Sequence, residues 1–296
     1  MYLKILSIEE ISEIYNTHMV NDFPKSELKP LAHIVNTAKK GICFSVGMYD
    51  DVEAKKEASL LGYAVFILPD WYKYGLLDYL AIIGKNRGKG YGHVFFSLVR
   101  EFFNRNFPYA EGIFIECESV ESAVNTKEAD IRMRRINFYK DCGCIETRLG
   151  SRLFGVEYSI LTLNIPIIQK EDDDSIVLSQ IKRDDLDYIY KKMFKPHHYK
   201  EQVCLWERLD YTTLSMPAKK LAPYLLGKLL CRKADGNILK YRITETECYC
   251  GEEDTACHAH KGKTDRTKVL YEKGGTSYVY LCYGIHSLFN VVSGVE

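Results

Sequence analysis

The sequence predicts an α+β protein with two domains of different character and a connection between them. The chain has 296 residues, which is more than one average domain. Residues 1–163 alternate strand-like apolar runs with amphipathic helices, whereas residues 207–296 carry short strands and turns after one helix. We therefore expect a mixed-sheet α/β domain, an extension and linker over 164–206, and a mixed α/β, largely antiparallel domain.

Composition excludes several classes of protein. A hydrophobic fraction of 46% is ample for packed cores and argues against wholesale disorder. The 40 basic and 40 acidic side chains balance, so any contact with DNA would need a local basic face. No apolar run reaches the length of a membrane span, and the first residues lack the order of a secretory signal. We expect a cytoplasmic protein with no membrane partner.

Ten cysteines raise the question of disulfides or a zinc site. The tightest group is Cys248, Cys250, Cys257, His258 and His260. The sequence has no Cys-x-x-Cys pair and nothing that marks an oxidising compartment, which weakens both alternatives. We expect free thiols and no metal.

The first domain should begin with a helix and a group of strands. Ser7 and Glu10 have the spacing of a capping box, which predicts a helix that runs toward His18. Strands are expected where β-branched and aromatic residues lie between turn residues, at 41–47, 62–68 and 76–83. The third run is apolar enough to lie centrally in a sheet.

The same alternation continues to the end of this domain. A helix should start at about Tyr91, because four apolar residues after it recur at the spacing of one helix face: Phe95, Leu98, Val99 and Phe102. A strand over 112–118, a helix over 129–142 and a closing strand over 158–163 should follow.

The first chemical signal is a glycine-rich loop between the strand over 76–83 and the next helix. Glycines let a tight loop expose successive backbone N–H groups, and the helix N-terminus adds a positive dipole, so such a loop can hold a pyrophosphate. An ordinary glycine turn is the alternative, and the spacing differs from the P-loop and the dinucleotide fingerprint. The loop consists of Arg87, Gly88, Lys89, Gly90, Tyr91 and Gly92.

A second motif lies on the later helix and the turn after it, where Phe138 and Tyr139 precede Gly143 and Cys144. With the glycine-rich loop it resembles the GCN5-related N-acetyltransferase (GNAT) family. That family binds the coenzyme A pyrophosphate through Arg/Gln-x-x-Gly-x-Gly/Ala and has a Phe-Tyr pair before a Gly-Phe turn. The loop matches in full, and Cys144 stands where an aromatic residue is usual. The resemblance, which includes strand order, covers residues 1–163.

The GNAT resemblance implies acetyl transfer from bound acetyl-CoA to an amine acceptor that the sequence does not identify. The glycine-rich loop would bind the cofactor. Tyr139 would protonate the leaving thiolate, a role that suits a phenol near the sulfur. The base is left open: Glu116 and Glu118 share one face of their strand by alternation, and either could act directly or through water. Both could equally be solvated strand acids.

The connection between the two domains differs from both of them in composition. Residues 170–175, Lys-Glu-Asp-Asp-Asp-Ser, form a charged segment, and residues 184–194 have the pattern of a short amphipathic helix. We interpret them as an extension of the first domain that leads into a linker.

The second domain should open with an amphipathic helix over 214–227 that ends at a glycine. Two strands, 228–233 and 239–247, follow and are joined by an Asp-Gly-Asn turn. A further strand over 275–284 carries aromatic residues two and three apart, and an apolar run comes after it.

An acidic and aromatic stretch, residues 244–258, carries the chemical signal of the second domain. A carboxylate beside stacking rings suits chemistry on an extruded nucleobase. With the aromatic block at 275–284, this stretch resembles the alkyladenine (3-methyladenine) DNA glycosylase family over residues 207–296. The pieces that match in order and spacing are Glu245-Thr-Glu-x-Tyr249, Glu253-Asp254, Ala256-x-His258, Gly275-Thr-x-Tyr-Val-Tyr280, Tyr283-Gly284 and Asn290.

The glycosylase resemblance implies excision of alkylated or deaminated purines, such as 3-methyladenine and hypoxanthine, from damaged double-stranded DNA without a cofactor. Glu247 would orient and deprotonate the attacking water. Tyr249, His258 and Tyr280 would stack around the flipped base, and Tyr283 would intercalate into the duplex. Asn290 would screen against guanine. Taken singly, each of these residues also has a purely structural interpretation, such as a solvated glutamate or an ordinary face of a sheet.

Glycosylases of this family continue well past the asparagine, so we expect the second domain to be incomplete at its C-terminus. An incomplete core should expose apolar surface and strand edges. Three functions are then compatible with the sequence. Both domains could be enzymes, the acetyltransferase alone could be active, or the second domain could be a damaged-DNA binding module that positions the acetyltransferase.

Overall fold

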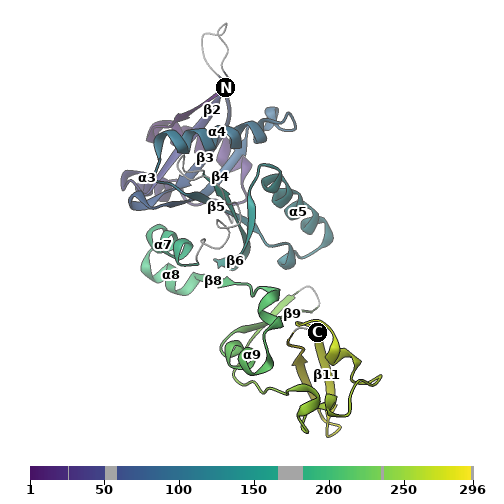
Figure 1. Ribbon diagram of the computed structural model, residues 1–296. Coiled ribbons are helices and arrows are strands. Elements are labelled where there is room, and N and C mark those ends of the chain that lie inside the picture. The colour runs from purple at the N-terminus through teal and green to yellow at the C-terminus, as the bar shows by residue number, and fades with distance from the viewer. Residues whose placement is uncertain (26, 51–58, 166–182, 235–236, 295–296) are drawn as a thin grey trace. The chain divides into compact units, whose positions relative to one another are not determined.

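The chain forms two compact units, Met1–Glu207 and Arg208–Glu296 (Figure 1). The computed structural model describes residues 1–25, 27–50, 59–165, 183–234 and 237–294. Both units combine helices and strands, which confirms the predicted α+β class.

An eight-stranded mixed sheet forms the framework of the first unit, in the order β1-β2-β3-β4-β5-β7-β6-β8. Neighbouring strands are antiparallel except β4 and β5, which are parallel. The strands are β1 (Tyr2–Ile5), β2 (Cys43–Tyr49), β3 (Leu60–Ile67), β4 (Tyr74–Ile82), β5 (Gly112–Glu118), β6 (Ile145–Leu153), β7 (Val156–Asn164) and β8 (Val203–Glu207).

The parallel pair opens the sheet. Pairing between β4 and β5 ends at Leu77 and Ile115, whereas β4 itself continues to Ile82 and β5 to Glu118. The later halves of the two strands therefore leave space between them, beside the loop that follows β4. Asp78 is an additional residue in β4 where its register against β3 shifts.

Helices cover both faces of this sheet. Ile113 and Ile115 of β5 pack with Phe95 and Phe103 of α4 in one cluster, whereas Phe114 packs with residues of α7 in another. This division follows from the alternation of side chains along a strand. The helices are α1 (Ile8–Ile14), α2 (Val20–Asp22), α3 (Leu31–Lys39), α4 (Tyr91–Asn106), α5 (Thr126–Asp141), α7 (Arg183–Met193) and α8 (Pro196–Gln202).

The capping box predicted at Ser7 is confirmed. The Glu10 N–H donates to Ser7 Oγ at 3.2 Å, and the Ser7 N–H donates to Glu10 Oε2 at 2.8 Å. A π-helical turn over Tyr15–Met19 continues α1, so the helical segment includes His18. The other strands and helices expected within residues 1–163 are also present, and β1, α3 and β6 are additions that were not predicted.

The segment after residue 182 belongs to the first unit. Its β8 pairs with β6, from Leu149 with Glu207 to Leu153 with Val203. Its α7 buries four side chains at helical spacing against Leu76, Phe114 and Ile160: Leu186, Ile189, Tyr190 and Met193. The helix expected over 184–194 is thus confirmed as α7, which adds to the core of the first unit, and β8 adds a strand to its sheet. The charged stretch over 170–175 lies outside the described residues.

The second unit contains two small antiparallel sheets within the described residues (Figure 1). One pairs β9 (Leu229–Ala234) with β10 (Asn237–Arg242), and the other pairs β11 (Ser277–Cys282) with β12 (His286–Val291). The helix expected over 214–227 is shorter, because Pro217 holds its neighbour Met216 extended and α9 (Ala218–Leu225) starts only after it. The predicted strand over 239–247 ends at Arg242, which leaves Glu247 in an irregular segment. Part of the predicted Asp-Gly-Asn turn lies outside the described residues.

Candidate functional sites

The glycine-rich loop leads directly into the N-terminus of α4. Gly88 and Gly90 have φ values of +73° and +79°, which favour glycine, and a Cβ at either would meet no atom within 4 Å. Gly90 is the N-cap of α4 and supplies no side chain to cap it. The first N–H groups of this 16-residue helix therefore have no side-chain cap and adjoin two glycines, an arrangement that suits an anionic group.

Gly92 of the first motif lies against Phe138 of the second motif. A Cβ at this position would lie 2.8 Å from Phe138 Cε2 and 2.9 Å from its Cζ. Glycine therefore lets α5 approach the first turn of α4. Arg87 lies at the base of the loop, where its Nε donates to the Ile82 carbonyl at 2.9 Å and its Nη2 pairs with Asp22 at 2.5 Å.

A cavity of about 1240 Å³ brings most of the predicted acetyltransferase residues together. It is lined by every residue of the glycine-rich loop except Lys89, and by Tyr139 and Glu116. The later half of β4 forms part of its wall, which matches the opening of the sheet between β4 and β5. Its charged lining includes the acids Asp22, Glu27, Asp78 and Glu116 and the bases Lys29, Arg87, Arg134, Arg135 and Lys195.

Tyr139 lies on α5 with only 8% of its surface exposed. Its ring packs edge-on against Phe96 at 5.3 Å between centroids and contacts Phe138 at 5.2 Å. Burial raises the pKa of Tyr139 far above the usual range of a phenol, so the hydroxyl keeps its proton. A protonated phenol in this cavity can serve as a proton donor.

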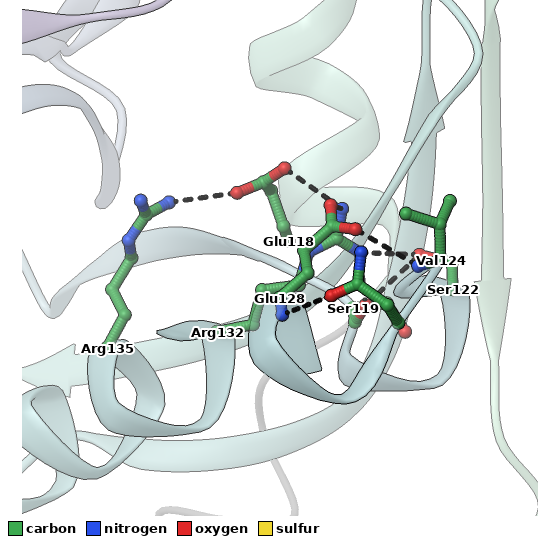
Figure 2. A network of polar contacts seen from close by, with 8 residues as sticks. Glu118, Ser119, Ser122, Val124, Glu128, Arg132 and Arg135 are labelled. Carbon is green, nitrogen blue, oxygen red and sulfur yellow. Dashed lines mark hydrogen bonds and ion pairs between the residues drawn. The ribbon is translucent and has the colours of Figure 1, made fainter. Parts of the chain in front are cut away.

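The two glutamates of β5 have different surroundings. Glu118 is held between Arg132 and Arg135 of α5, at 3.2 Å from each (Figure 2). Arg132 also pairs with Glu128 at 2.5 Å and donates to the Ser119 carbonyl at 2.6 Å, so this network ties the end of β5 to α5. Glu118 is thus occupied in a structural network and is not among the residues that line the cavity.

Glu116 lines the cavity and lies under α7. The Tyr190 hydroxyl donates a hydrogen bond to Glu116 Oε1. Burial raises the pKa of Glu116 to about 7, while the Tyr190 hydrogen bond and the charge of Lys29 act in the opposite direction. Sequence reasoning found Glu116 but missed Tyr190, because nothing near residue 190 marks a site and the two residues are 74 positions apart.

In the second unit, Glu247 and Tyr249 form a direct pair. The Tyr249 hydroxyl donates to Glu247 Oε2 at 2.6 Å, and this hydrogen bond raises the pKa of Tyr249 to about 12. Glu247 is exposed, and Tyr249 has 40% of its surface exposed. The carboxylate is therefore oriented by a phenol but open on its other side.

Three rings gather beside this pair. His258 lies 4.4 Å from the ring centroid of Tyr280, and its Nδ1 is 3.1 Å from the hydroxyl of Tyr278. Tyr278 and Tyr280 share one face of β11, with centroids 5.5 Å apart. Burial, and then the charges of nearby groups that include Glu247, raise the pKa of Tyr280. Sequence reasoning assigned His258 and Tyr280 to the pocket but missed Tyr278, which orients the imidazole.

Tyr283 and Asn290 lie at different depths of the β11–β12 hairpin. Tyr283 is at its tip with 91% of its surface exposed and a φ of +54°, a conformation that costs a non-glycine residue free energy. The ring thus projects away from the unit. Asn290 pairs in register with Tyr278, and its amide donates to the Tyr278 carbonyl at 3.3 Å.

Neither a metal centre nor a membrane-spanning helix emerges from the described parts of the chain. Within them, no three His, Cys, Asp or Glu side chains gather closely enough to hold a metal ion. No helix there is long and apolar enough to cross a membrane.

Comparison with known proteins finds similarity in the second unit. Residues 212–296 match the methylpurine-DNA glycosylase (MPG) family. A putative 3-methyladenine DNA glycosylase from Natranaerobius thermophilus is 51% identical over 86 residues, which are 29% of this chain and 43% of that protein. A second putative 3-methyladenine DNA glycosylase, from Psychrobacter cryohalolentis, is 54% identical over 84 residues, which are 26% of this chain and 40% of that protein. The chain thus spans less than half the length of these curated relatives.

The first unit is similar to solved acetyltransferases. One is a putative acetyltransferase of the GNAT family from Bacteroides thetaiotaomicron, at 18% identity and a TM-score of 0.43, covering 60% of this chain and 93% of that one. The chain thus has a mixed-sheet first unit that carries the two motifs, and its residues 212–296 match the MPG family.

Proposed function

We propose that the first unit is an acetyl-CoA-dependent N-acetyltransferase. The observation that carries the proposal is the single cavity shared by the glycine-rich loop, Tyr139 and Glu116. Acetyl-CoA supplies the acetyl group as a thioester. The uncapped N–H groups of α4 suit its pyrophosphate, and the open surroundings of Gly88 and Gly90 give the phosphates access to them.

The residues of the cavity can donate and accept the two protons that such a transfer moves. When an amine nitrogen bonds to the acetyl carbon and the carbon–sulfur bond breaks, the sulfur needs a proton and the new ammonium must lose one. Tyr139 holds a proton at its hydroxyl because burial raises its pKa. A carboxylate in the same cavity can take the ammonium proton.

The test measures the release of CoA in the presence of each of a panel of primary amines. A thiol reagent detects the CoA that is released. The substitution Tyr139→Phe keeps the ring that packs on Phe96 and removes the proton donor, so kcat should fall about 100-fold, the low end for general acid catalysis. Acetyl-CoA affinity should stay the same. Tyr109→Phe is the matched control, because Tyr109 packs on Trp71 and is not among the residues that line the cavity. Equal rates in both variants would refute the role of Tyr139.

We further propose that the second unit carries the base-recognition part of a DNA glycosylase for alkylated or deaminated purines, such as 3-methyladenine and hypoxanthine. Support comes from Glu247 held by Tyr249 beside the rings of His258 and Tyr280. The half-buried rings of His258 and Tyr280 suit stacking on a flipped base, and Tyr283 at the hairpin tip suits intercalation into damaged duplex DNA. Glu247 would deprotonate the water whose oxygen bonds to the anomeric carbon as the base departs.

The glycosylase proposal is tested by release of hypoxanthine from duplex DNA. Glu247→Gln should abolish release and retain lesion binding, whereas Glu245→Gln, two residues away, should retain both. Two other outcomes distinguish the alternatives. Lesion-dependent binding without any release would favour a DNA-binding module, and neither binding nor release would favour a protein in which only the acetyltransferase is active.

A further inference from the structure

We infer that Glu116 is the group that takes the proton from the acceptor amine, and that Tyr190 of α7 positions and tunes it. This inference rests on the proposed acetyltransferase function. It means that the segment 183–207, which follows the part with the two cofactor motifs, completes the site.

Position separates Glu116 from the other carboxylates of β4 and β5. It lies where pairing between β4 and β5 has ended, in the wall of the cavity that also holds Tyr139. Glu118 is fixed between Arg132 and Arg135. Asp78 pairs with Lys29 at 2.5 Å with 7% of its side chain exposed. Both carboxylates are therefore already engaged by a cation, whereas no ion pair holds Glu116 among the described residues.

Glu116 differs because its hydrogen-bond partner is a neutral phenol. The groups that face it come from four elements: Tyr190 on α7, Tyr158 on β7, Asp78 on β4 and Lys29 before α3. Lys29 and Asp78 are themselves paired, so their opposing influences on Glu116 partly cancel. Burial then dominates and brings the pKa of Glu116 to about 7, where a base is half ionised at neutral pH.

Tyr190 is built into the core so that its hydroxyl meets Glu116. The side chain is fully buried, and its ring lies 6.0 Å from that of Phe194. Its hydroxyl oxygen is also 3.1 Å from Ser151 Oγ on β6, a residue that is itself fully buried. Because a phenol has one proton, donating it to Glu116 leaves its oxygen to accept from Ser151. Burial and the Glu116 charge raise the pKa of Tyr190, which keeps it a donor.

The direction of the tuning follows from this contact. A hydrogen bond to the charged form of a carboxylate favours that form. Removing the Tyr190 hydroxyl should therefore raise the pKa of Glu116 and reduce the fraction that can act as a base at neutral pH. The rate should recover at higher pH, because the carboxylate itself is still present.

The experiment measures kcat/KM against pH in the full chain with the amine that gives the fastest CoA release. Glu116→Gln should lower kcat/KM about 100-fold or more at its optimum. Tyr190→Phe should move the acid limb of the profile to higher pH by on the order of one unit, as expected when a hydrogen bond to a charged group is lost. Ser151→Ala, which leaves the ring in place, should move it the same way by less. Glu118→Gln is the matched control and should leave the limb where it is.

Calorimetric titration with acetyl-CoA accompanies each variant, so that loss of the fold is recognised as loss of binding. A Tyr190→Phe profile lowered equally at every pH, together with an unmoved limb in Ser151→Ala, would overturn the tuning role. Transfer by Glu116→Gln within a few-fold of wild type would overturn the assignment of the base. Failure of the wild type to bind acetyl-CoA would instead contradict the proposed function. Binding without transfer to any amine of the panel would contradict both.

Discussion

The two candidate sites differ in how the protein around them supports their chemistry. Tyr139 and Glu116 lie in a cavity behind an eight-stranded sheet, and burial raises the pKa of each. Glu247 and Tyr249 lie on an exposed segment beside a two-stranded sheet. The first site carries its own low-dielectric surroundings. The second can obtain them only when something else covers it, and a base stacked on the exposed rings would do so.

The same contrast holds for apolar side chains. Three clusters of buried residues fill the first unit. In the second, Tyr278 is buried, but Val279, Leu281 and Phe289 from the opposite face of the same hairpin have 57%, 60% and 50% of their surface exposed. The stability of the two units should therefore respond differently to the same substitution.

The largest expected effect compares two phenylalanines. Phe103 is fully buried, so Phe103→Ala should lower the free energy of unfolding of the first unit by about 3–5 kcal/mol. Phe289→Ala should leave that unit unchanged. Both tryptophans, Trp71 and Trp206, lie in the first unit, so urea unfolding followed by tryptophan fluorescence reports on it alone. A shift of that transition in Phe289→Ala would show that the two units unfold together.

The next effect is the pH dependence of stability that Glu116 should confer. Its pKa is raised from 4.5 to about 7 in the folded protein. The stabilising contribution of the protonated group is thus complete below pH 4.5 and is lost as pH rises through 7, by about 3 kcal/mol. The difference in unfolding free energy between wild type and Glu116→Gln should change by that amount between these pH values. A constant difference would contradict the burial argument, and Glu247→Gln should produce no change in the tryptophan signal.

A smaller effect is expected at the glycines. Gly92→Ala forces the Phe138 ring of α5 to shift beside the first turn of α4, because its Cβ would lie 2.8 Å from that ring, so acetyl-CoA affinity should fall about tenfold, or about 1.4 kcal/mol. Gly284→Ala is the control in the second unit. Its φ of +75° makes that substitution strained, but a Cβ there meets no atom within 4 Å. Equal acetyl-CoA affinity in both variants would argue against a site at the start of α4.

Local patterns predicted the parts of each site that are contiguous in sequence. Each of these parts lies within one short segment. The glycine-rich loop is one loop, Tyr139 belongs to a motif on one helix, and Glu247 and Tyr249 are two residues apart. The choice between Glu116 and Glu118 could not be predicted in this way, since alternation puts both on one face of β5. It depends on Arg132, Arg135 and Tyr190, which other elements bring to the two carboxylates.

The pairing of β8 with β6 could also not be predicted from the sequence. The strand β8 is short, and β6 carries polar residues such as Arg148 and Arg152, so neither indicates that the two pair in one sheet. Only that pairing shows why α7 lies over Phe114 and reaches Glu116. The sequence placed Tyr190 in an extension of the first domain, but it gave no sign that this helix reaches Glu116.

The most direct test of the central claim is calorimetric titration of the full chain with acetyl-CoA. The account predicts saturable binding of one molecule per chain, weakened by Gly92→Ala and unchanged by Glu247→Gln or Phe289→Ala. Absence of binding, or equal weakening by the substitutions in the second unit, would contradict the claim that the first unit holds a complete acetyl-CoA site.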